Sequence, residues 1–233
     1  MKIALLGYGK MGKTIEKIAT ERGHEIVLKV DDSQTPYDIS VADVAIEFST
    51  PDSAFNNIVS CIKSQVPVIA GTTGWLKDYD KAVEICKKHQ SAFLYASNFS
   101  VGVNVFFALN KKLAKLMAPL KNYEVSIEEI HHTQKLDAPS GTAITLAEGI
   151  IANSDKTAWK LGQAGTTEIP IESKRIENVP GTHIITYESQ VDTIEIKHTA
   201  HSREGFALGA VLAAEWILNR KGVFSMTDVL GID

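Results

Sequence analysis

Short apolar runs alternate with amphipathic segments over roughly the first hundred residues of the chain. Apolar runs are typical of buried strands, whereas apolar residues that recur every three or four positions are typical of helices. In segment 10–22, for example, Ile15, Ile18 and Ala19 have the spacing of one helix face. Alternating strands and helices predict a parallel sheet with helices on both faces. The predicted strands are 2–6, 25–30, 41–49, 67–72 and 91–97, and the predicted helices are 10–22, 52–64 and 77–88.

The pattern changes after residue 97. Ile194, Ile196 and His198 alternate with polar residues, which is typical of a strand with one face exposed to water. We therefore predict an α+β part with a mostly antiparallel sheet, in which segment 163–180 is polar without a clear period. The predicted helices are 103–117, 142–152 and 204–219, the last followed by a short tail, and the predicted strands are 124–130, 183–189 and 193–200. The final helix could pack on either part.

Composition is that of an ordinary globular protein. The chain has 233 residues, 44% of them hydrophobic and 22% charged, which suits one large or two modest domains. A net charge of −4 argues against nucleic-acid binding as the main function. The longest apolar stretch, 206–218, contains Glu215 and is too short to span a bilayer. Cys61 and Cys86 are not in a CxxC pattern, which predicts buried free thiols and a cytosolic protein.

A glycine motif lies between the first predicted strand and the first predicted helix. Gly7, Gly9 and Gly12 form G-x-G-x-x-G, which allows a tight turn and a close approach of the backbone to a pyrophosphate. Asp31 ends the second strand, where a carboxylate can accept hydrogen bonds from ribose hydroxyls. The alternative is a purely structural glycine turn. We predict that the dinucleotide contacts are Gly7, Tyr8, Gly9, Lys10, Met11, Gly12 and Asp31.

Charges near this motif bear on the choice of dinucleotide. The carboxylates of Asp31 and Asp32 repel the 2′-phosphate of NADP, whereas Lys10 and Lys29 are cations that could compensate for that phosphate. The sequence therefore favours NADH without excluding NADPH.

Two further loops follow predicted strands at the edge where open parallel sheets bind ligands. The first carries Gly71, Thr72 and Thr73, whose backbone and hydroxyl groups could meet a ribose or a nicotinamide amide. In the second, Phe99 could cover a flat ring. Taken alone, both are ordinary polar loops. The second loop contributes Ala96, Ser97, Asn98 and Phe99 to the predicted cofactor contacts.

Segment 129–142 has the densest set of reactive side chains. His131 and His132 are adjacent at a strand end and point different ways, so they do not favour zinc without a third ligand. Histidine beside Lys135 suits proton transfer and anion binding instead. Ser140 is a predicted N-cap, and the N–H groups of the following helical turn would bind a carboxylate. We therefore predict a site for a small dianion and no metal; the alternative is a solvated loop.

At this point the sequence resembles the 4-hydroxy-tetrahydrodipicolinate reductases (dihydrodipicolinate reductases) of lysine and diaminopimelate synthesis. The resemblance covers nearly the whole chain. Its most specific part is the His-His-x-x-Lys-x-Asp-Ala-Pro-Ser-Gly-Thr that ends segment 129–142. The other matching segments are 7–12, 47–51, 71–74, 98–104, 201–203 and 206–210.

The resemblance implies a fold and a reaction. Segment 1–102 would be a Rossmann-type doubly wound domain with 206–233 packing back on it, and 103–205 a substrate-binding and oligomerisation domain of a homotetramer. The enzyme would reduce a cyclic dicarboxylate, with loss of water, using NADH or NADPH. The proton donor and acceptor role falls on His131 and proton donation on Lys135. Substrate-carboxylate binding falls on His132, Gly141 and Thr142, and we add Ser140 to the predicted substrate contacts.

The chain departs from the family pattern in two places. It is shorter than many relatives between the helix after Thr142 and Arg175, and Glu177 stands where the family usually has Gly. We expect an altered loop there, whereas the His-His-x-x-Lys core is complete.

Two other functions fit part of the pattern. A different amino-acid-pathway dehydrogenase could share the two-domain plan, and it would release or take up ammonia. A non-catalytic NAD(H) sensor is the other alternative, but it would not need His131, His132 and Lys135 clustered before a helix.

Overall fold

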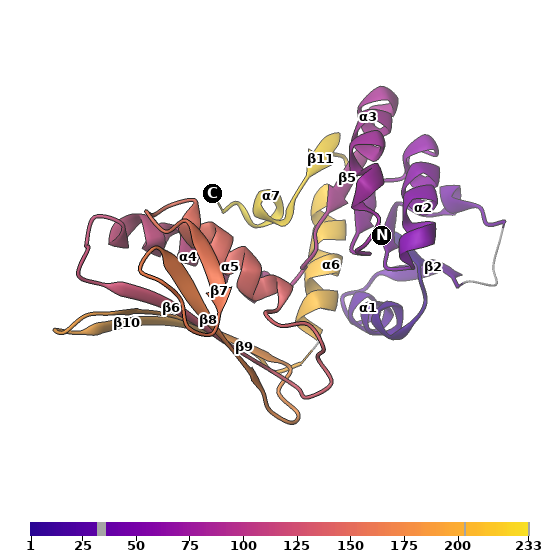
Figure 1. Ribbon diagram of the computed structural model, residues 1–233. Helices are drawn as coiled ribbons and strands as arrows, with labels where there is room; N and C mark the ends of the chain where they lie inside the picture. Colours follow the sequence, from indigo (N-terminus) through magenta and orange to yellow (C-terminus); the bar gives the residue numbers. More distant parts are fainter. Residues whose placement is uncertain (32–35, 203, 233) are drawn as a thin grey trace. The chain divides into compact units, whose positions relative to one another are not determined.

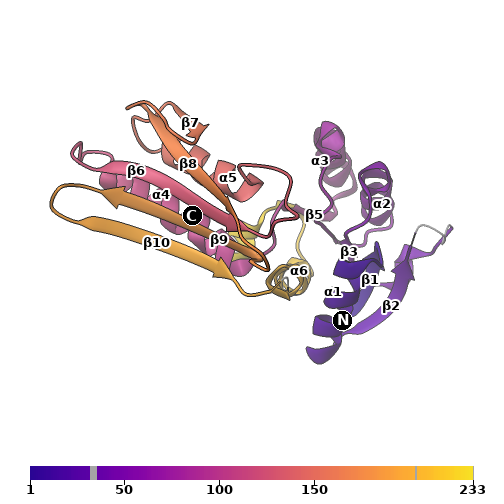
Figure 2. The same ribbon diagram turned by 60° about the horizontal axis from the view of Figure 1, so that its bottom comes forward.

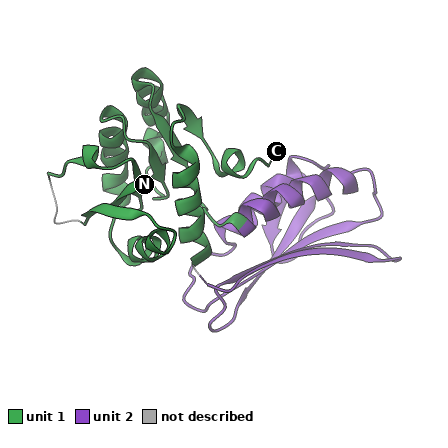
Figure 3. Ribbon diagram, turned by 180° about the vertical axis from the view of Figure 1, so that it is seen from behind, with its two compact units in different colours: residues 1–101, 204–233 green, residues 102–203 purple. Residues whose placement is uncertain are grey.

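Two compact units make up the chain in the computed structural model, which describes residues 1–31, 36–202 and 204–232 (Figure 3). Unit 1 comprises Met1–Val101 and Glu204–Asp233, and unit 2 comprises Gly102–Arg203. Unit 1 is therefore built from two stretches of chain that the whole of unit 2 separates.

Unit 1 is a parallel sheet with helices on both faces (Figure 1). Side chains of β1 (Lys2–Leu6) alternate between two hydrophobic clusters: Ile3 and Leu5 pack in one, Ala4 and Leu6 in the other. This alternation confirms the predicted doubly wound architecture. The sheet order is β11 (Gly222–Phe224), β5 (Ala92–Tyr95), β4 (Val68–Ala70), β3 (Val44–Glu47), β1 (Lys2–Leu6), β2 (Glu25–Val30).

Each face of this sheet has its own pair of covering helices. On one face α1 (Lys10–Glu21) lies beside α6 (Glu204–Ile217), and on the other lie α2 (Pro51–Lys63) and α3 (Tyr79–His89). Cys61 and Cys86 are buried in the second cluster as free thiols, as predicted.

Short elements depart from the predicted ones. Residues Ile39–Val41 form a 3-10 turn, in which the Asp38 carboxylate accepts a hydrogen bond from Ser40 N, so β3 begins later than expected. A second 3-10 turn, Leu76–Asp78, precedes α3. The tail forms β11 and α7 (Met226–Leu230), which are too short for a period to reveal them.

Unit 2 packs two helices on one face of a five-stranded sheet (Figure 2). The helices are α4 (Val101–Met117) and α5 (Gly141–Ile151). The sheet order is β10 (Thr193–Ala200), β9 (Gly181–Glu188), β6 (Glu124–His131), β8 (Glu168–Arg175), β7 (Ala158–Leu161).

The second sheet is mixed rather than mostly antiparallel. β9 pairs antiparallel with β10 and β6, whereas β8 pairs parallel with β6 and β7. The prediction missed β7 and β8 because the inner face of β8 changes from Ile169 and Ile171 to Ser173 and Arg175, which removes the apolar alternation. In the part of the chain that the structure describes, no helix is long and apolar enough to cross a membrane.

Candidate active site

The glycine turn between β1 and α1 is packed from behind and open at its tip. Gly7 has φ +100°, and a side chain there would overlap the Phe48 carbonyl; a side chain on Gly12 would overlap the Gly7 carbonyl. At Gly9, by contrast, no described atom lies within 4 Å of where a Cβ would stand, and no described side chain caps α1. This open backbone at a helix N-terminus fits a pyrophosphate.

The carboxyl ends of β3, β4 and β5 bring the other predicted cofactor loops to the same edge of the sheet. Glu47 joins two of these ends, since its Oε1 accepts hydrogen bonds from Ser49 N at 2.9 Å and Thr72 Oγ1 at 3.0 Å. The Glu47 side chain is fully buried, and this burial raises its pKa despite those hydrogen bonds. Thr73 and Ser97 are exposed on the two loops.

Phe99 does not have the role that we predicted for its ring. The side chain is 2% exposed, lies in the core beside α6 and contacts Phe48, with the ring centroids 5.6 Å apart. Gly209 of α6 allows this packing, because a side chain there would overlap the Phe99 carbonyl. A cofactor could reach Phe99 only through its backbone.

Charged groups near Asp31 are partly engaged with one another. Lys29 Nζ lies 2.5 Å from Glu16 Oε1 and 4.9 Å from the centroid of the Tyr8 ring, whose hydroxyl donates to Glu16. Asp31 and Lys10 are exposed, and Asp32 lies outside the described residues. Of the two cations that could meet a 2′-phosphate, Lys29 is therefore already paired.

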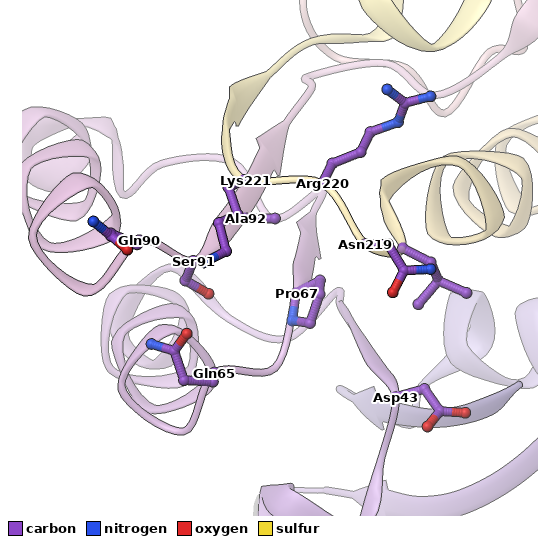
Figure 4. A pocket seen from close by; sticks show the side chains of 10 residues that line it. Asp43, Gln65, Pro67, Gln90, Ser91, Ala92, Asn219, Arg220 and Lys221 are labelled. Atoms are coloured by element: carbon purple, nitrogen blue, oxygen red, sulfur yellow. The ribbon is translucent and has the colours of Figure 1, made fainter.

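A cavity of about 590 Å³ in unit 1 lies away from all of these residues (Figure 4). Asp43, Pro67 and Ala92 line it at the amino ends of β3, β4 and β5, the edge opposite the glycine turn. Open parallel sheets bind their ligands at the carboxyl edge, so we do not place the cofactor in this cavity.

In unit 2, strand alternation turns Glu129 and His131 of β6 toward the helices. The two side chains are 0% and 10% exposed, and His131 Nδ1 lies 2.5 Å from Glu129 Oε2. Burial alone would raise the pKa of Glu129, but its interactions with His131, Ser173, Arg175 and Ser140 together outweigh burial and lower that pKa far below the usual value. Glu129 is therefore a buried carboxylate.

The N-terminus of α5 connects to this pair through a second histidine. Ser140 Oγ accepts a hydrogen bond from Ala143 N at 3.2 Å, which confirms the predicted N-cap, and lies 3.1 Å from His183 Nε2. Burial, with smaller contributions from the charges of His131 and others, lowers the pKa of His183 to about 3. A neutral His183 packs edge-on against His131, with ring centroids 5.1 Å apart.

Arg175 fixes the loop that follows His131. Its Nη2 donates to Glu129 Oε1 at 3.0 Å and to the Asp137 carbonyl at 2.6 Å, and its Nε donates to the Lys135 carbonyl at 3.2 Å. Lys135 Nζ in turn contacts both carboxylate oxygens of Asp137, at 2.8 and 2.9 Å. One guanidinium thus holds the backbone on both sides of the loop's exposed Leu136.

The predicted substrate residues differ in exposure. Gly141 is exposed at the start of α5, and His132, Lys135 and Thr142 are half-buried. Ser140 is 2% exposed, so its hydroxyl is committed to the cap and to His183 rather than to a ligand. At Glu177 the backbone is ordinary; the left-handed residue of that turn is the neighbouring Asn178, with φ 60°.

Glu129, His131 and His183 form the group of metal-ligand types that the described residues bring together, with ligand atoms within 4.8 Å of one another. These atoms already face protein groups: Arg175 and His131 approach the carboxylate, and Ser140 approaches His183. The Arg175 charge beside Glu129 also opposes a cation, so the geometry favours a hydrogen-bonded cluster over a metal centre.

The sequence analysis did not predict three residues of the buried cluster around His131: Glu129, Arg175 and His183. Strand register brings them together, since His131 pairs with Arg175 of β8 and Glu129 with His183 of β9. The one available signal was the spacing of Glu129, two residues before His131 on the same face of a strand.

Comparisons with known proteins agree along the whole chain. Residues 1–99 match the family model described as dihydrodipicolinate reductase, N-terminus, and residues 102–230 match dihydrodipicolinate reductase, C-terminus. The 4-hydroxy-tetrahydrodipicolinate reductase of Christiangramia forsetii is 61% identical over 233 residues, covering 99% of this chain and 98% of that protein. The one from Methanosarcina barkeri is 37% identical over 97% of this chain and 83% of its own length.

A solved structure shares the fold. The dipicolinate-bound dihydrodipicolinate reductase from Paenisporosarcina sp. TG-14 superposes with a TM-score of 0.79 at 22% identity, covering 98% of each chain. The parallel sheet with its open glycine turn, together with the family matches, defines this chain as an oxidoreductase that uses NADH or NADPH. Within that class, the chain belongs to the dihydrodipicolinate reductase family.

Proposed function

We propose that the protein reduces 4-hydroxy-tetrahydrodipicolinate to tetrahydrodipicolinate, with loss of water, in diaminopimelate and lysine synthesis. The observation that carries this proposal is the 61% identity, over nearly the full chain, to a reductase of that name. A motif before the capped start of α5 supports the proposal, and it contains His131, His132 and Lys135. Binding a cyclic dicarboxylate requires an anion site, and its reduction requires a proton donor.

Unit 1 would hold the dinucleotide. The turn Gly7–Gly12 suits the pyrophosphate, and Asp31 suits the ribose hydroxyls. The two loops after β4 and β5 would flank the nicotinamide ribose, and Phe99 would contribute its backbone. The other residues of these loops are Gly71, Thr72, Thr73, Ala96, Ser97 and Asn98. When bound, the reduced nicotinamide supplies a hydride to the substrate ring. An exposed Asp31 favours NADH, and Lys10 in the turn is the cation nearest in sequence for NADPH.

Unit 2 would hold the substrate. We assign one substrate carboxylate to the first-turn N–H groups of α5 at Gly141 and Thr142, where a helix N-terminus favours an anion. Ser140 contributes indirectly, since its cap orders that turn. His132 and Lys135 would complement the dianion from the preceding loop.

Proton transfer would fall on His131. Reduction leaves an enamine that must take up a proton, and an imidazole can both accept and donate one near neutral pH. Lys135 acts chiefly as a positive charge, with proton donation as its second role.

A coupled assay tests the proposal. The preceding synthase makes the substrate in place from pyruvate and aspartate semialdehyde, and oxidation of NADH or NADPH is followed by absorbance. We expect oxidation that depends on every component, with both dinucleotides accepted. Ammonia-dependent turnover would instead indicate another dehydrogenase, and NADH binding without any oxidation would indicate a sensor.

We further propose that the enzyme works as a homotetramer in the cytoplasm. The face of the unit 2 sheet opposite α4 and α5 carries Ile130 and Ile184, which supports an interface there. The buried free thiols support a reducing compartment. Light scattering on the purified protein measures the assembly, and a monomeric mass would contradict it.

A further inference from the structure

Glu129 is a buried charge that contacts the predicted site residues His131 and Ser140 from behind and is itself closed to a ligand. Its side chain is fully buried at the strand end that carries His131. An ionised carboxylate in such a place is costly unless it is paired and hydrogen bonded. Arg175 Nη2 and Ser140 N donate hydrogen bonds to Oε1, at 3.0 and 3.2 Å. Oε2 lies 2.5 Å from His131 Nδ1, a close contact whose direction is not that of a regular hydrogen bond. Among the described residues, the His131 imidazole is the group that this oxygen approaches as an ion pair.

This geometry selects one form of the His131 ring. An ionised carboxylate repels a nitrogen lone pair at this distance and attracts an N–H group, so the contact favours a proton on Nδ1. The neutral His131 ring is therefore protonated on Nδ1, which leaves the lone pair on Nε2. Gly181 lies beside that nitrogen, and a side chain there would crowd it, since its Cβ would stand 3.1 Å from His131 Nε2. Proton exchange at His131 is thereby directed to Nε2.

We propose that Glu129 is a positioning residue for the reaction, which holds His131 in its Nδ1-protonated tautomer so that Nε2 takes up and delivers the proton. Arg175 supports it in two ways: it balances the Glu129 charge, and it holds the backbone of Lys135 and Asp137. The inference rests on the proposed function only for its effect on turnover. The tautomer itself is a property of unit 2.

The test compares Glu129→Gln and Glu129→Asp with Asp155→Asn as the control. Asp155 is an exposed carboxylate of unit 2 that pairs with Lys121 at 2.7 Å. Two readouts are used: kcat and KM in the coupled assay, and the tautomer of His131 from long-range ¹H–¹⁵N NMR correlations of the ring. Thermal melting and the dispersion of the unit 2 signals in the NMR spectrum report whether each variant is folded.

We expect Glu129→Gln to lower kcat by roughly 10²- to 10⁴-fold while KM stays within about threefold, because an amide can also donate to the imidazole and no longer fixes its tautomer. Its NMR spectrum should show a mixture of tautomers. Glu129→Asp keeps the carboxylate, so it should retain the Nδ1-protonated ring and recover part of the turnover. Asp155→Asn should match the wild type in both readouts.

Three results would overturn the inference. One is a wild-type His131 protonated on Nε2, which decides the matter even if no variant folds. Another is a Glu129→Gln enzyme with unchanged kcat and tautomer. The third is a stoichiometric divalent cation on purified protein that is lost from Glu129→Gln, since a metal would displace the Nδ1 proton. An inactive wild type with the Nδ1 tautomer would instead remove the proposed function and leave the inference standing.

Discussion

His183 is a neutral histidine in a place that excludes a charged one. Its pKa is lowered to about 3, chiefly by burial, against an ordinary value near 6.5. Between these two values the unfolded chain binds a proton that the folded chain does not. The free energy of unfolding therefore falls as pH drops below about 6.5.

Replacement of this histidine should reduce the acid sensitivity of the fold. Between pH 7 and 5 the wild type should lose up to about 2 kcal/mol through this residue, and His183→Gln should lose less over the same interval. Urea unfolding at the two pH values measures the difference. His89→Gln, at the end of α3, is the control, and an identical pH dependence in His183→Gln and the wild type would contradict the prediction.

His131 and Lys135 should carry most of the acid–base and charge chemistry. His131→Ala and Lys135→Ala should each lower kcat by roughly 10²- to 10⁴-fold. Lys121→Ala is the matched control for the lysine, because Lys121 pairs with Asp155 at 2.7 Å much as Lys135 pairs with Asp137. Unchanged turnover in both site variants would remove these residues from the mechanism.

Single residues were predictable where a local motif marks them. His131, Lys135 and Ser140 stand together in the sequence, and the structure confirms the cap at Ser140. Glu129, Arg175 and His183 were not predictable as a group, because β6, β8 and β9 must pair in register before they meet. The predicted contact between the Phe99 ring and the cofactor was wrong because an aromatic residue in a loop can equally well pack in the core.

At the scale of elements, two glycines of the turn from β1 to α1 should have different roles: Gly9 in binding the dinucleotide and Gly12 in packing. Gly9→Ala should leave the melting temperature nearly unchanged, because φ is −81° and no described atom crowds its Cβ position, yet it should raise the KM for NADH about tenfold or more. Gly12→Ala should lower the melting temperature, since its Cβ would overlap the Gly7 carbonyl. A Gly9→Ala enzyme with unchanged KM would place the dinucleotide elsewhere.

Long elements with one clear period were predicted nearly to their ends. β1, β2 and β10 have the predicted bounds, and α4 differs only by beginning two residues earlier. The parallel pairing of β7 and β8 was not predictable. The end of β8 near Arg175 has polar residues on its inner face, so the alternation of apolar and polar positions that marks a strand is lost there. Arg175, one of the polar residues that made β8 difficult to predict, belongs to the buried cluster around His131.

At the scale of the whole molecule, unit 1 needs both of its stretches. α6 packs beside α1 in the first hydrophobic cluster, and Glu215 of α6 accepts two hydrogen bonds from Arg22, each at 2.8 Å. A chain truncated before Glu204 would expose the α1 face of the sheet. We expect it to bind the dye ANS and to lose NADH binding, both followed by fluorescence. NADH binding with the affinity of the full chain would contradict this prediction, and Arg22→Ala tests the ion pair separately.

The two-part character of the chain was visible in the sequence as a change of period after residue 97. The period alone did not show on which part the last helix packs, because α6 is apolar almost all round and Gly209 fits against Phe99 only in the folded core; the family resemblance was what placed that helix on the first part. The mutual fit of distant segments is a property of the folded core rather than of any local pattern.

The interrupted course of unit 1 has a consequence for biosynthesis. As the nascent chain leaves the ribosome, the inserted unit 2 is complete before the unit that begins the sequence. Domains usually fold in the order of their synthesis, but here the nucleotide-binding half must wait, with its α1 face uncovered, until the segment that starts at Glu204 emerges. That interval is when holding chaperones would engage this protein and when a stalled translation product would be most readily degraded.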